Sequence, residues 1–425
     1  MKVDVDWMHS HTEEWFNTIR AIHLEELKRH PSSYEYSEHL HKILKEGWTA
    51  ERIKELVREL AEWKDIHATP PSPVYEPVVT PLRTQGKYFY KGESLFRVQG
   101  KTMFLLLARM FRGEDITPQL AWCANHNVNM IRVLVAGVEW NGWDDYRRPF
   151  DRVDYAETLG SLFRLAAKHG LYVEASVVSY NGLPKSDWKR ALSLVYEEAK
   201  FHANVLVEVS NEPWCRDTDP IDLMTGINRG KILSAYGIQS PMDGCPMLDY
   251  GTIHTQRDME HFPRNGKELY EFQNATNTPW IDDEPLGIAN YDKVGAGART
   301  TDRLAVTCHF ATAALFGGAT LHSQFGLNGE LPSDTTSEEL SNLVQSVWEF
   351  IPPETMLGEY AAPHMGNFPA ICPDGSCSKL GHAYARLFPN HAYMVIPMPT
   401  HTPILNPPWR IADQLEDLPV WKLIR

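Results

Sequence analysis

Apolar runs alternate with amphipathic helical segments from about residue 102 to residue 350, and this alternation restricts the possible folds more than any other feature of the sequence. The runs "NMIRVLVAG" and "LYVEASVV" are apolar enough to be covered on both faces of a sheet. Between them, "AETLGSLFRLAAKHG" places its apolar residues on one side of a helix and ends in glycine. Strands that alternate with helices in this way form parallel sheets with right-handed crossovers.

Eight strands are predicted, and eight β/α units spread over roughly 250 residues close into a barrel. The strands lie near residues 102, 129, 171, 205, 231, 250, 279 and 319. The first is expected in the apolar run "TMFLLLARM". The fifth and sixth are the least distinct, because no clear helix separates them. The predicted fold class is therefore α/β, with a (β/α)8 TIM barrel.

The segments outside the barrel differ in composition and divide the chain into four predicted parts. Residues 1–67 form a helical appendage, in which Thr49 is expected to be the N-cap of a helix. Residues 68–85 contain five prolines and form an extended connector. The barrel spans residues 86–350 and starts with a hairpin around "KYFYKGESLFRVQGK". Residues 351–425 form a small β element, which either packs on the barrel or completes this hairpin.

Polar residues that end apolar strands are the candidates for chemistry, because the C-terminal ends of the strands carry the active site of such a barrel. Glu212 closes the fourth strand and Glu284 the seventh, while His254 lies in the sixth and Arg132 in the second. Two carboxylates on strands four and seven face each other across the mouth of the barrel. Cleavage of a glycosidic bond needs this layout, with one carboxyl group as acid and the other as nucleophile or base.

The motifs "NEP" at 211–213 and "DEP" at 283–285 resemble those of the clan-A retaining glycoside hydrolases, which include cellulases, mannanases and β-galactosidases. The resemblance implies that Glu212 is the acid/base and Glu284 the nucleophile, with side chains roughly 5 Å apart. As in family five of that clan, Glu208 stands three residues before Asn211, and Arg132 lies in the second strand. This implies that Arg132 neighbours the nucleophile and that Asn211 binds the 2-hydroxyl group of the sugar.

The sequence departs from the family-five pattern at three places. In the sixth, His254 is followed by Gln256 where a tyrosine is usual, and the eighth offers His322 and Gln324 where a tryptophan is common. A histidine near the third or fourth strand is also missing from "SVVSYNG". The resemblance therefore covers residues ~86–350 at the level of the clan, and the exact family is unassigned.

Further polar and aromatic residues near the strand ends are candidates for substrate binding, although surplus aromatic residues usually only pack. The substrate-binding candidates are Arg132, Asn211, His254, Trp140, Trp143, Tyr180, Trp214, His322 and Gln324. Glu208 is expected to be an interior carboxylate paired with Arg132. Asp282 and Asp283 compete with Glu284 as nucleophiles, but alternation places Asp282 deeper on the face of Glu284, as the buried partner of a base.

The function expected from these features is hydrolysis of β-glycosidic bonds by double displacement through a covalent glycosyl-enzyme, with an oligosaccharide, a polysaccharide or a glycoside as substrate. A transglycosylase using the same site and a non-catalytic carbohydrate-binding barrel are the alternatives. A metal-dependent hydrolase would be expected to carry His-X-His on the first strand, which "MFLLLARM" lacks. No metal or other cofactor is expected, and "HSH" at 9–11 is taken as the start of a helix.

Charge and composition exclude other classes. The formal net charge of −14 argues against nucleic acid as a partner. No apolar run is long enough for a signal peptide or a membrane span, so we expect either a cytoplasmic protein or a mature secreted form without its leader. Of the six cysteines, only Cys372 and Cys377 could close a small loop as a disulfide. The oligomeric state is not predicted.

Overall fold

The structure is a computed structural model, and some segments lie outside the residues it describes. The described residues are 18–19, 22, 49–55, 80–140, 142–179, 183–211, 219–238, 249–254, 265–283, 287–288, 299–300, 302–321, 324–361, 367–371, 383–396, 404–416 and 418–425. The chain divides into two compact units, residues 1–74 with 109–116 and residues 75–108 with 117–425. The second unit contains the barrel and the candidate site.

Residues 50–55 of the first unit are helical. The side-chain oxygen of Thr49 accepts a hydrogen bond of 3.3 Å from the backbone N–H of Arg52, as expected for an N-cap. The prediction for Thr49 is thereby confirmed. The motif at residues 9–11 and most of the connector at 68–85 lie outside the described residues.

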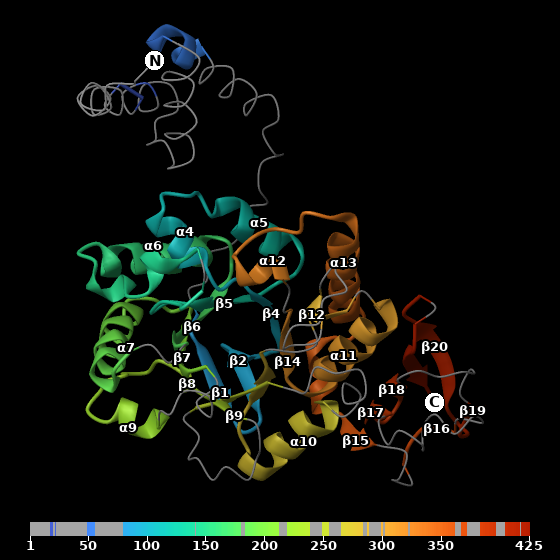
Figure 1. Ribbon diagram of the computed structural model, residues 1–425. Coiled ribbons are helices and arrows are strands. Elements are labelled where there is room, and N and C mark those ends of the chain that lie inside the picture. Colours follow the sequence, from blue (N-terminus) through green and yellow to red (C-terminus); the bar gives the residue numbers. More distant parts are fainter. Residues whose placement is uncertain are drawn as a thin grey trace. The chain divides into compact units, whose positions relative to one another are not determined.

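Parallel strands form a barrel at the centre of the second unit (Figure 1). In chain order they are β4 (Val98–Thr102), β5 (Met130–Leu134), β6 (Tyr172–Val178), β7 (Val205–Ser210), β8 (Ser234–Ala235), β9 (Gly237–Ile238), β10 (Gly251–Ile253), β11 (Trp280–Asp282) and β14 (Gly318–Leu321). Only Tyr236 separates β8, which pairs with β7, from β9, which pairs with β10. The two short strands together take the fifth place, and β14 pairs with β4 to close the ring.

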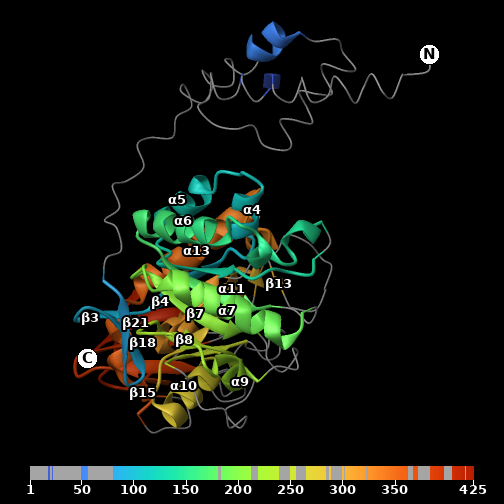
Figure 2. The same ribbon diagram turned by 90° about the vertical axis from the view of Figure 1, so that its left-hand side faces the viewer.

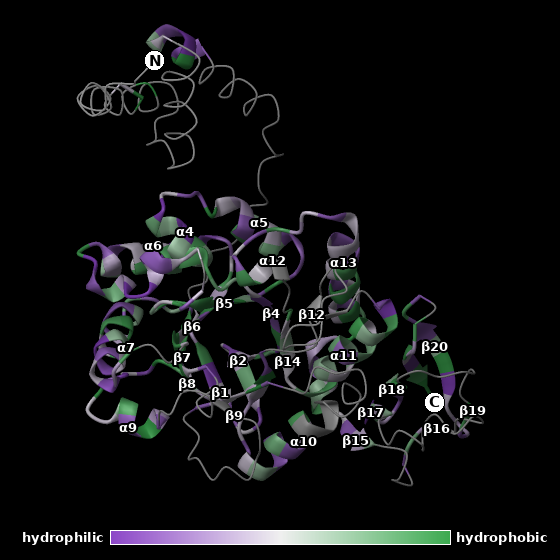
Figure 3. Ribbon diagram, viewed as in Figure 1, coloured by the Kyte–Doolittle hydropathy of each residue, from purple (hydrophilic) through white to green (hydrophobic). Residues whose placement is uncertain are grey.

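Helices follow the strands and cover the outside of the barrel (Figure 2). They are α5 (Thr117–Asn125), α6 (Tyr155–Lys168), α7 (Lys185–Ala199), α9 (Pro220–Met224), α10 (Asn265–Thr276), α11 (Arg303–Phe316) and α13 (Thr335–Phe350). Figure 3 shows hydrophilic and hydrophobic residues alternating round α6 and α7, as expected of amphipathic helices. By contrast, every residue of α11 from Ala305 to Phe316 is buried. This helix is buried because the barrel, the helices α10 and α13 and the C-terminal sheet all pack against it.

The predicted first strand is wrong, because the barrel strand lies a few residues earlier. β4 is "VQGKT", and the apolar run that follows it contains the helix α4 (Leu106–Phe111). A short apolar run fits a buried helix as well as a buried strand, and periodicity cannot separate the two. β4 itself looks polar and contains Gly100, where a Cβ atom would lie 2.5 Å from the side-chain oxygen of Thr320 in β14. Glycine therefore permits the close approach of these two strands.

The predicted hairpin at the start of the barrel is present and has a third strand. The strands β1 (Leu82–Gln85), β2 (Tyr88–Lys91) and β3 (Ser94–Phe96) form an antiparallel sheet, and Gly92 has a φ of +59° in its second turn. Phe89 and Phe96 join the apolar cluster at the first residues of the barrel strands. This sheet covers the N-terminal end of the barrel.

The C-terminal region forms a separate antiparallel sheet, which leaves the N-terminal hairpin unextended. Its strand order is β15 (Glu359–Ala361), β17 (Tyr384–Leu387), β18 (His391–Val395), β21 (Val420–Ile424) and β20 (Arg410–Gln414). The predicted strands in "HAYMVIPMPT" and "VWKLIR" are therefore confirmed. The sheet packs on the barrel, since the Nε–H of the buried Arg386 donates to the carbonyl oxygen of Leu315 in α11 at 2.8 Å.

Short elements complete the described structure. They are η1 (Asp144–Tyr146), η2 (Pro149–Asp151), η5 (Pro353–Leu357), α12 (Gln324–Leu327), and the two-stranded sheets β12 (Gly287–Ile288) with β13 (Arg299–Thr300) and β16 (Ala370–Ile371) with β19 (Ile404–Leu405). Among the described residues, no helix is long and apolar enough to cross a membrane. Cys372 and Cys377 lie outside these residues, so their disulfide stays a prediction.

Candidate active site

Along four barrel strands, the inward-facing side chain is apolar near the N-terminal end and ionisable two residues later. At the N-terminal end, Met130, Tyr172, Leu206 and Ile281 belong to one apolar cluster. Two residues further along each strand, on the same face, the chain carries an ionisable side chain. These are Arg132 after Met130, Glu174 after Tyr172, Glu208 after Leu206 and Asp283 after Ile281. The C-terminal half of the barrel therefore encloses a layer of charged groups.

Arg132 is the centre of this layer and is fully buried. It holds Glu208 in a bidentate pair, because Nε donates to Oε2 at 3.1 Å and Nη2 donates to Oε1 at 3.0 Å and to Oε2 at 2.8 Å. Nη2 also donates to Oδ1 of Asn211 at 2.9 Å and lies 3.0 Å from Oδ2 of Asp283. The guanidinium carbon stands 5.2 Å from the ring centre of Phe104. One cation thus connects strands β5 and β7 with the residue that follows β11.

The predicted pair of Glu208 and Arg132 is confirmed, and both residues are interior. Burial by itself would raise the pKa of Glu208, but Arg132, Ser176 and His254 together outweigh it and the pKa is lowered. A third contact comes from Thr252 of β10, whose hydroxyl group donates to Oε1 of Glu208 at 3.2 Å. Glu208 is therefore the ionised partner of the guanidinium.

The other two carboxyl groups of the layer hold their protons to higher pH. Burial raises the pKa of Glu174 to about 8, and the nearby Glu208 and Asp283 add to the effect. Oε1 of Glu174 accepts a hydrogen bond of 2.7 Å from the hydroxyl group of Tyr250. Burial likewise raises the pKa of Asp283 to about 7, although Arg132 and His254 act to lower it. The guanidinium of Arg132 does not keep three buried carboxyl groups ionised at neutral pH.

The two aspartates of "WIDDEP" face opposite sides of the barrel wall. Asp282 is buried, and its Oδ2 lies 2.9 Å from Nε2 of His309 in α11, so it is the partner of a base, as predicted. Its predicted place deep inside the site is wrong, because it faces outward to α11. Asp283 is on the inward side, where its Oδ1 lies 3.3 Å from Nε2 of His254. This inward position is not among the expectations drawn from the sequence. The sequence could have indicated this position. Side chains two residues apart on a strand face the same side, so an inward-facing Ile281 implies an inward-facing Asp283.

The structure brings three of the predicted binding residues together, namely Arg132, Asn211 and His254, around Asp283. Trp140 and Trp143 lie in the loop after β5 and are half-buried. The ring centre of Trp140 stands 6.0 Å from that of Phe104, which itself faces Arg132. Trp140 is thereby one ring away from the guanidinium.

The remaining candidates lie wholly or partly outside the described residues. Gln324 begins α12, and its side chain is not among the described ones. The predicted residues outside the described ranges are Glu212, Glu284, Trp214, Tyr180 and His322. Their roles stay predictions.

Glu208, His254 and Asp283 offer ligand atoms within 4.8 Å of one another, a spacing that could hold a metal ion. Arg132 contacts both Glu208 and Asp283 in this cluster. Its guanidinium already supplies the positive charge that the carboxylates require, and it would repel a divalent cation from the same position. The donor set therefore fits the arginine better than a metal.

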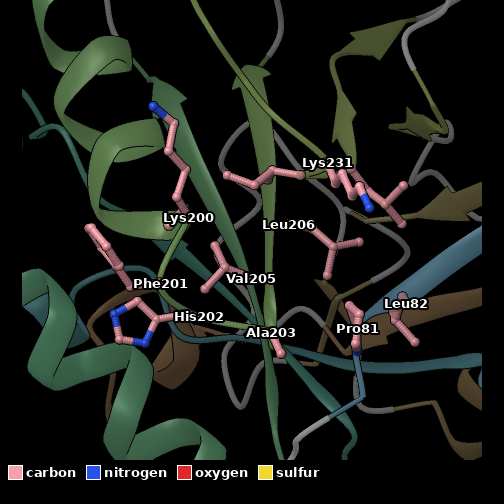
Figure 4. Close-up of a pocket in the computed structure, with 12 residues that line it drawn as sticks. Pro81, Leu82, Lys200, Phe201, His202, Ala203, Val205, Leu206 and Lys231 are labelled. Carbon is pink, nitrogen blue, oxygen red and sulfur yellow. The ribbon is translucent and has the colours of Figure 1, made fainter.

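A cavity of about 450 Å³ lies away from this cluster, at the other end of the strands (Figure 4). Val205 and Leu206 at the start of β7 line it, together with Leu82 of β1 and Lys200, which follows α7. The parallel direction of the strands places Asn211 and Asp283 at the opposite, C-terminal end. The cavity is therefore separate from the candidate site.

The fold and the polar layer define a (β/α)8 barrel with an ionisable cluster toward the C-terminal ends of its strands. No family model and no curated protein matches the chain.

Among solved structures, the chain is similar to a glycoside hydrolase family 5 from Bacteroides vulgatus, with 14% identity, 76% of this chain and 81% of that chain covered, and a TM-score of 0.52. It is also similar to a putative glycoside hydrolase from Bacteroides vulgatus, with 12% identity, coverage of 84% and 83%, and a TM-score of 0.54. A third structure, described as a glycoside hydrolase, has 15% identity, coverage of 76% and 84%, and a TM-score of 0.55. These similarities establish the shared barrel fold.

Proposed function

We propose that the protein is a retaining glycoside hydrolase that cleaves β-glycosidic bonds, with Glu284 as nucleophile and Glu212 as acid/base. One observation carries this proposal. Nη2 of Arg132 lies 2.9 Å from the side chain of Asn211 and 3.0 Å from that of Asp283. The next residues along the chain are Glu212 and Glu284. A single guanidinium nitrogen therefore ties together the two chain segments that carry the candidate carboxylates.

The reaction proceeds by two displacements at the anomeric carbon. In the first, a carboxylate oxygen of Glu284 forms a bond to this carbon while the bond to the glycosidic oxygen breaks, and Glu212 gives its proton to the departing oxygen. In the second, Glu212 takes a proton from water, the water oxygen forms a bond to the anomeric carbon, and the bond to Glu284 breaks. Both carboxyl groups then return to their starting states, so no cofactor is consumed.

Arg132 and Asn211 support this division of roles. The positive charge of Arg132 acts to lower the pKa of carboxyl groups near it, which favours an ionised nucleophile, although Glu208 and Asp283 share this charge. Oδ1 of Asn211 accepts a hydrogen bond from Arg132. This contact orients the amide so that its Nδ2–H groups can donate to a substrate. We propose that Nδ2 binds the 2-hydroxyl group of the sugar, a contact that strengthens in the oxocarbenium-like transition state.

The remaining candidates would form the walls of the sugar site. We propose that His254 binds a hydroxyl group next to Asp283, and that Trp140 and Trp143 offer ring faces for stacking. The other candidates for substrate binding follow strand ends in the sequence. They are Tyr180, Trp214, His322 and Gln324. Similarity in fold to solved glycoside hydrolases supports an oligosaccharide, polysaccharide or glycoside substrate.

Trapping with 2-fluoro-glycosides tests the proposal, because a fluorine at C2 slows the second displacement and the glycosyl-enzyme accumulates. A panel of 2-fluoro sugars with good leaving groups is incubated with the protein, followed by peptide mass spectrometry. We expect a label on Glu284 with at least one sugar, and no label in the Glu284→Gln variant. Hydrolysis of the corresponding aryl β-glycoside identifies the same sugar.

Two other results would contradict part or all of this proposal. A label on Asp283 would keep the retaining mechanism and contradict the nucleophile assignment. Sugar binding without any label or turnover across the panel would contradict the proposal and indicate a carbohydrate-binding barrel.

A further inference from the structure

Asp283 has a place in the cluster that neither the catalytic pair nor the buried Arg132–Glu208 pair explains. It directly precedes Glu284 and is fully buried. Its two carboxyl oxygens contact different groups, with Oδ2 at 3.0 Å from Nη2 of Arg132 and Oδ1 at 3.3 Å from Nε2 of His254. A side chain used only for packing would not need two ionisable neighbours, one on β5 and one directly after β10.

We propose that Asp283 is a positioning residue that, as a carboxylate, holds Arg132 and His254 in the arrangement the reaction needs; this inference rests on the proposed function. Nη2 of Arg132 is shared by Glu208, Asn211 and Asp283. Glu208 of β7 pairs with one side of the guanidinium, and Asp283 at the end of β11 contacts the same group. With both contacts in place, the nitrogen that binds Asn211 has a fixed position.

The charges round Asp283 decide when it can act in this way. Among the residues that the structure describes, the titratable groups that face it come from β5, β6, β7 and the two ends of β10. They are Arg132, Glu174, Glu208, Tyr250 and His254. Because Asp283 is buried and the negative charge of Glu208 lies nearby, its pKa is raised to about 7, although Arg132 and His254 act to lower it. Below that pH Asp283 is neutral and Arg132 is held by Glu208 and Asn211. Above it, the carboxylate completes the set of contacts.

Kinetics of Asp283→Asn against Asp282→Asn test this inference. The two variants make the same chemical change at neighbouring buried residues, but Asp282 faces His309 outside the barrel wall. With an aryl β-glycoside that the wild type hydrolyses, we expect the kcat of the wild type to rise with a midpoint near pH 7. In Asp283→Asn this rise is lost, and kcat falls on the order of 10- to 100-fold with little change in KM, because a small displacement of a positioned group has effects of this size.

Asp282→Asn is expected to keep the rise near pH 7, and so is Asp283→Glu, which restores a carboxylate. An unchanged pH profile in Asp283→Asn would overturn the inference. So would an equal loss of kcat and of the profile in Asp282→Asn, because the effect would then reflect damage to the end of β11. Circular dichroism of each variant reports whether it has folded.

A measurement without turnover separates this inference from the proposed function. Selective ¹⁵N labelling of arginine gives a signal for the Nε–H of Arg132, which Arg132→Lys assigns by its disappearance. We expect this signal to shift with a midpoint near pH 7 in the wild type and in Asp282→Asn. In Asp283→Asn this step is lost, and only the titration of Glu174 near pH 8 still moves the signal. A constant signal in the wild type would overturn the pairing even if the protein hydrolyses glycosides. If no β-glycoside is hydrolysed, the proposed function fails, and the arginine signal still decides whether Asp283 pairs with Arg132.

Discussion

At the scale of single residues, three buried carboxyl groups surround Arg132, whose single positive charge can balance only one carboxylate. Glu208 takes the bidentate contact with Arg132, and the Nε of Arg132 is 3.9 Å from Oε2 of Glu174. Burying an ion pair costs much of what its attraction contributes, so such a cluster is weak evidence for stability. Its presence beside Asn211 at the C-terminal ends of the strands is better explained by function.

Glu174 should make the stability of the protein depend on pH. Its carboxyl group loses its proton at an ordinary pKa of 4.5 in the unfolded chain but keeps it to about 8 in the folded protein. Between these values the unfolded state has released a proton that the folded state retains, so the free energy of unfolding falls as pH rises. Glu174→Gln keeps an acceptor for Tyr250 and removes this loss.

We therefore expect Glu174→Gln to gain stability relative to the wild type from pH 4.5 to pH 8, by up to about 1.4 kcal/mol per pH unit. Urea denaturation of both proteins at several pH values in this range measures the difference. A difference that does not change with pH would show that Glu174 titrates alike in the folded and unfolded states.

At the scale of elements, closure of the barrel depends on a glycine at the start of β14. Gly318 has a φ of +96°, and a Cβ atom there would lie 2.0 Å from the carbonyl oxygen of Val98 in β4. Gly318 and Val98 are partners in the register of the closing pair. An alanine at this position would combine a strained backbone with a collision against the main chain of the neighbouring strand.

Gly318→Ala should accordingly lower the free energy of unfolding by at least ~3 kcal/mol. Gly92→Ala is the matched control, because Gly92 also has a positive φ of +59° but has no atom within 4 Å of the place that an added methyl group would take. Its cost should be about 1–2 kcal/mol, from backbone strain alone. Equal midpoints for the two variants in urea would mean that the β4–β14 contact does not restrict residue 318.

At the scale of the barrel unit, the C-terminal sheet is attached to the barrel through a buried arginine. Arg386 of β17 donates to the carbonyl oxygens of Leu315 in α11 and of Gly358 before β15, at 2.8 Å and 3.1 Å. Its guanidinium also faces the ring of Phe316 at 4.7 Å. The first of these contacts satisfies a carbonyl group at the end of α11 that the helix itself leaves unpaired. We infer that the barrel and this sheet unfold together.

Arg386→Met removes both donors while keeping an apolar side chain of similar length. We expect one unfolding transition, shifted by about 2–4 kcal/mol, because two buried carbonyl groups lose a charged donor. Arg410→Met on the exposed strand β20 is the control and should change the stability little. Separate transitions for the sheet and the barrel, followed by near- and far-ultraviolet circular dichroism, would contradict this inference.

Much of the barrel could be predicted because its signals are local. The helices α6 and α7 show their apolar stripes within one stretch of sequence. Strands such as β6 and β7 are mostly apolar and are buried along their whole length. The pair of Glu208 and Arg132 was also predictable, since an ionisable residue inside a buried strand requires a partner of opposite charge.

The amino-acid sequence alone determined the succession of strands and helices and the polar residues at the strand ends, because periodicity and charge are properties of short segments. The tertiary structure decided what depends on neighbours distant in the chain. β4 is a strand despite its polar sequence because β5 and β14 pair with it, and "LLARMF" is then left to form α4. Asp283 rather than Asp282 meets Arg132 because Ile281 packs into the barrel core, which sets the inward side of β11. Whether a segment forms a strand, and which way its side chains face, depends on the elements that pack against it. Those elements are formed by other parts of the chain.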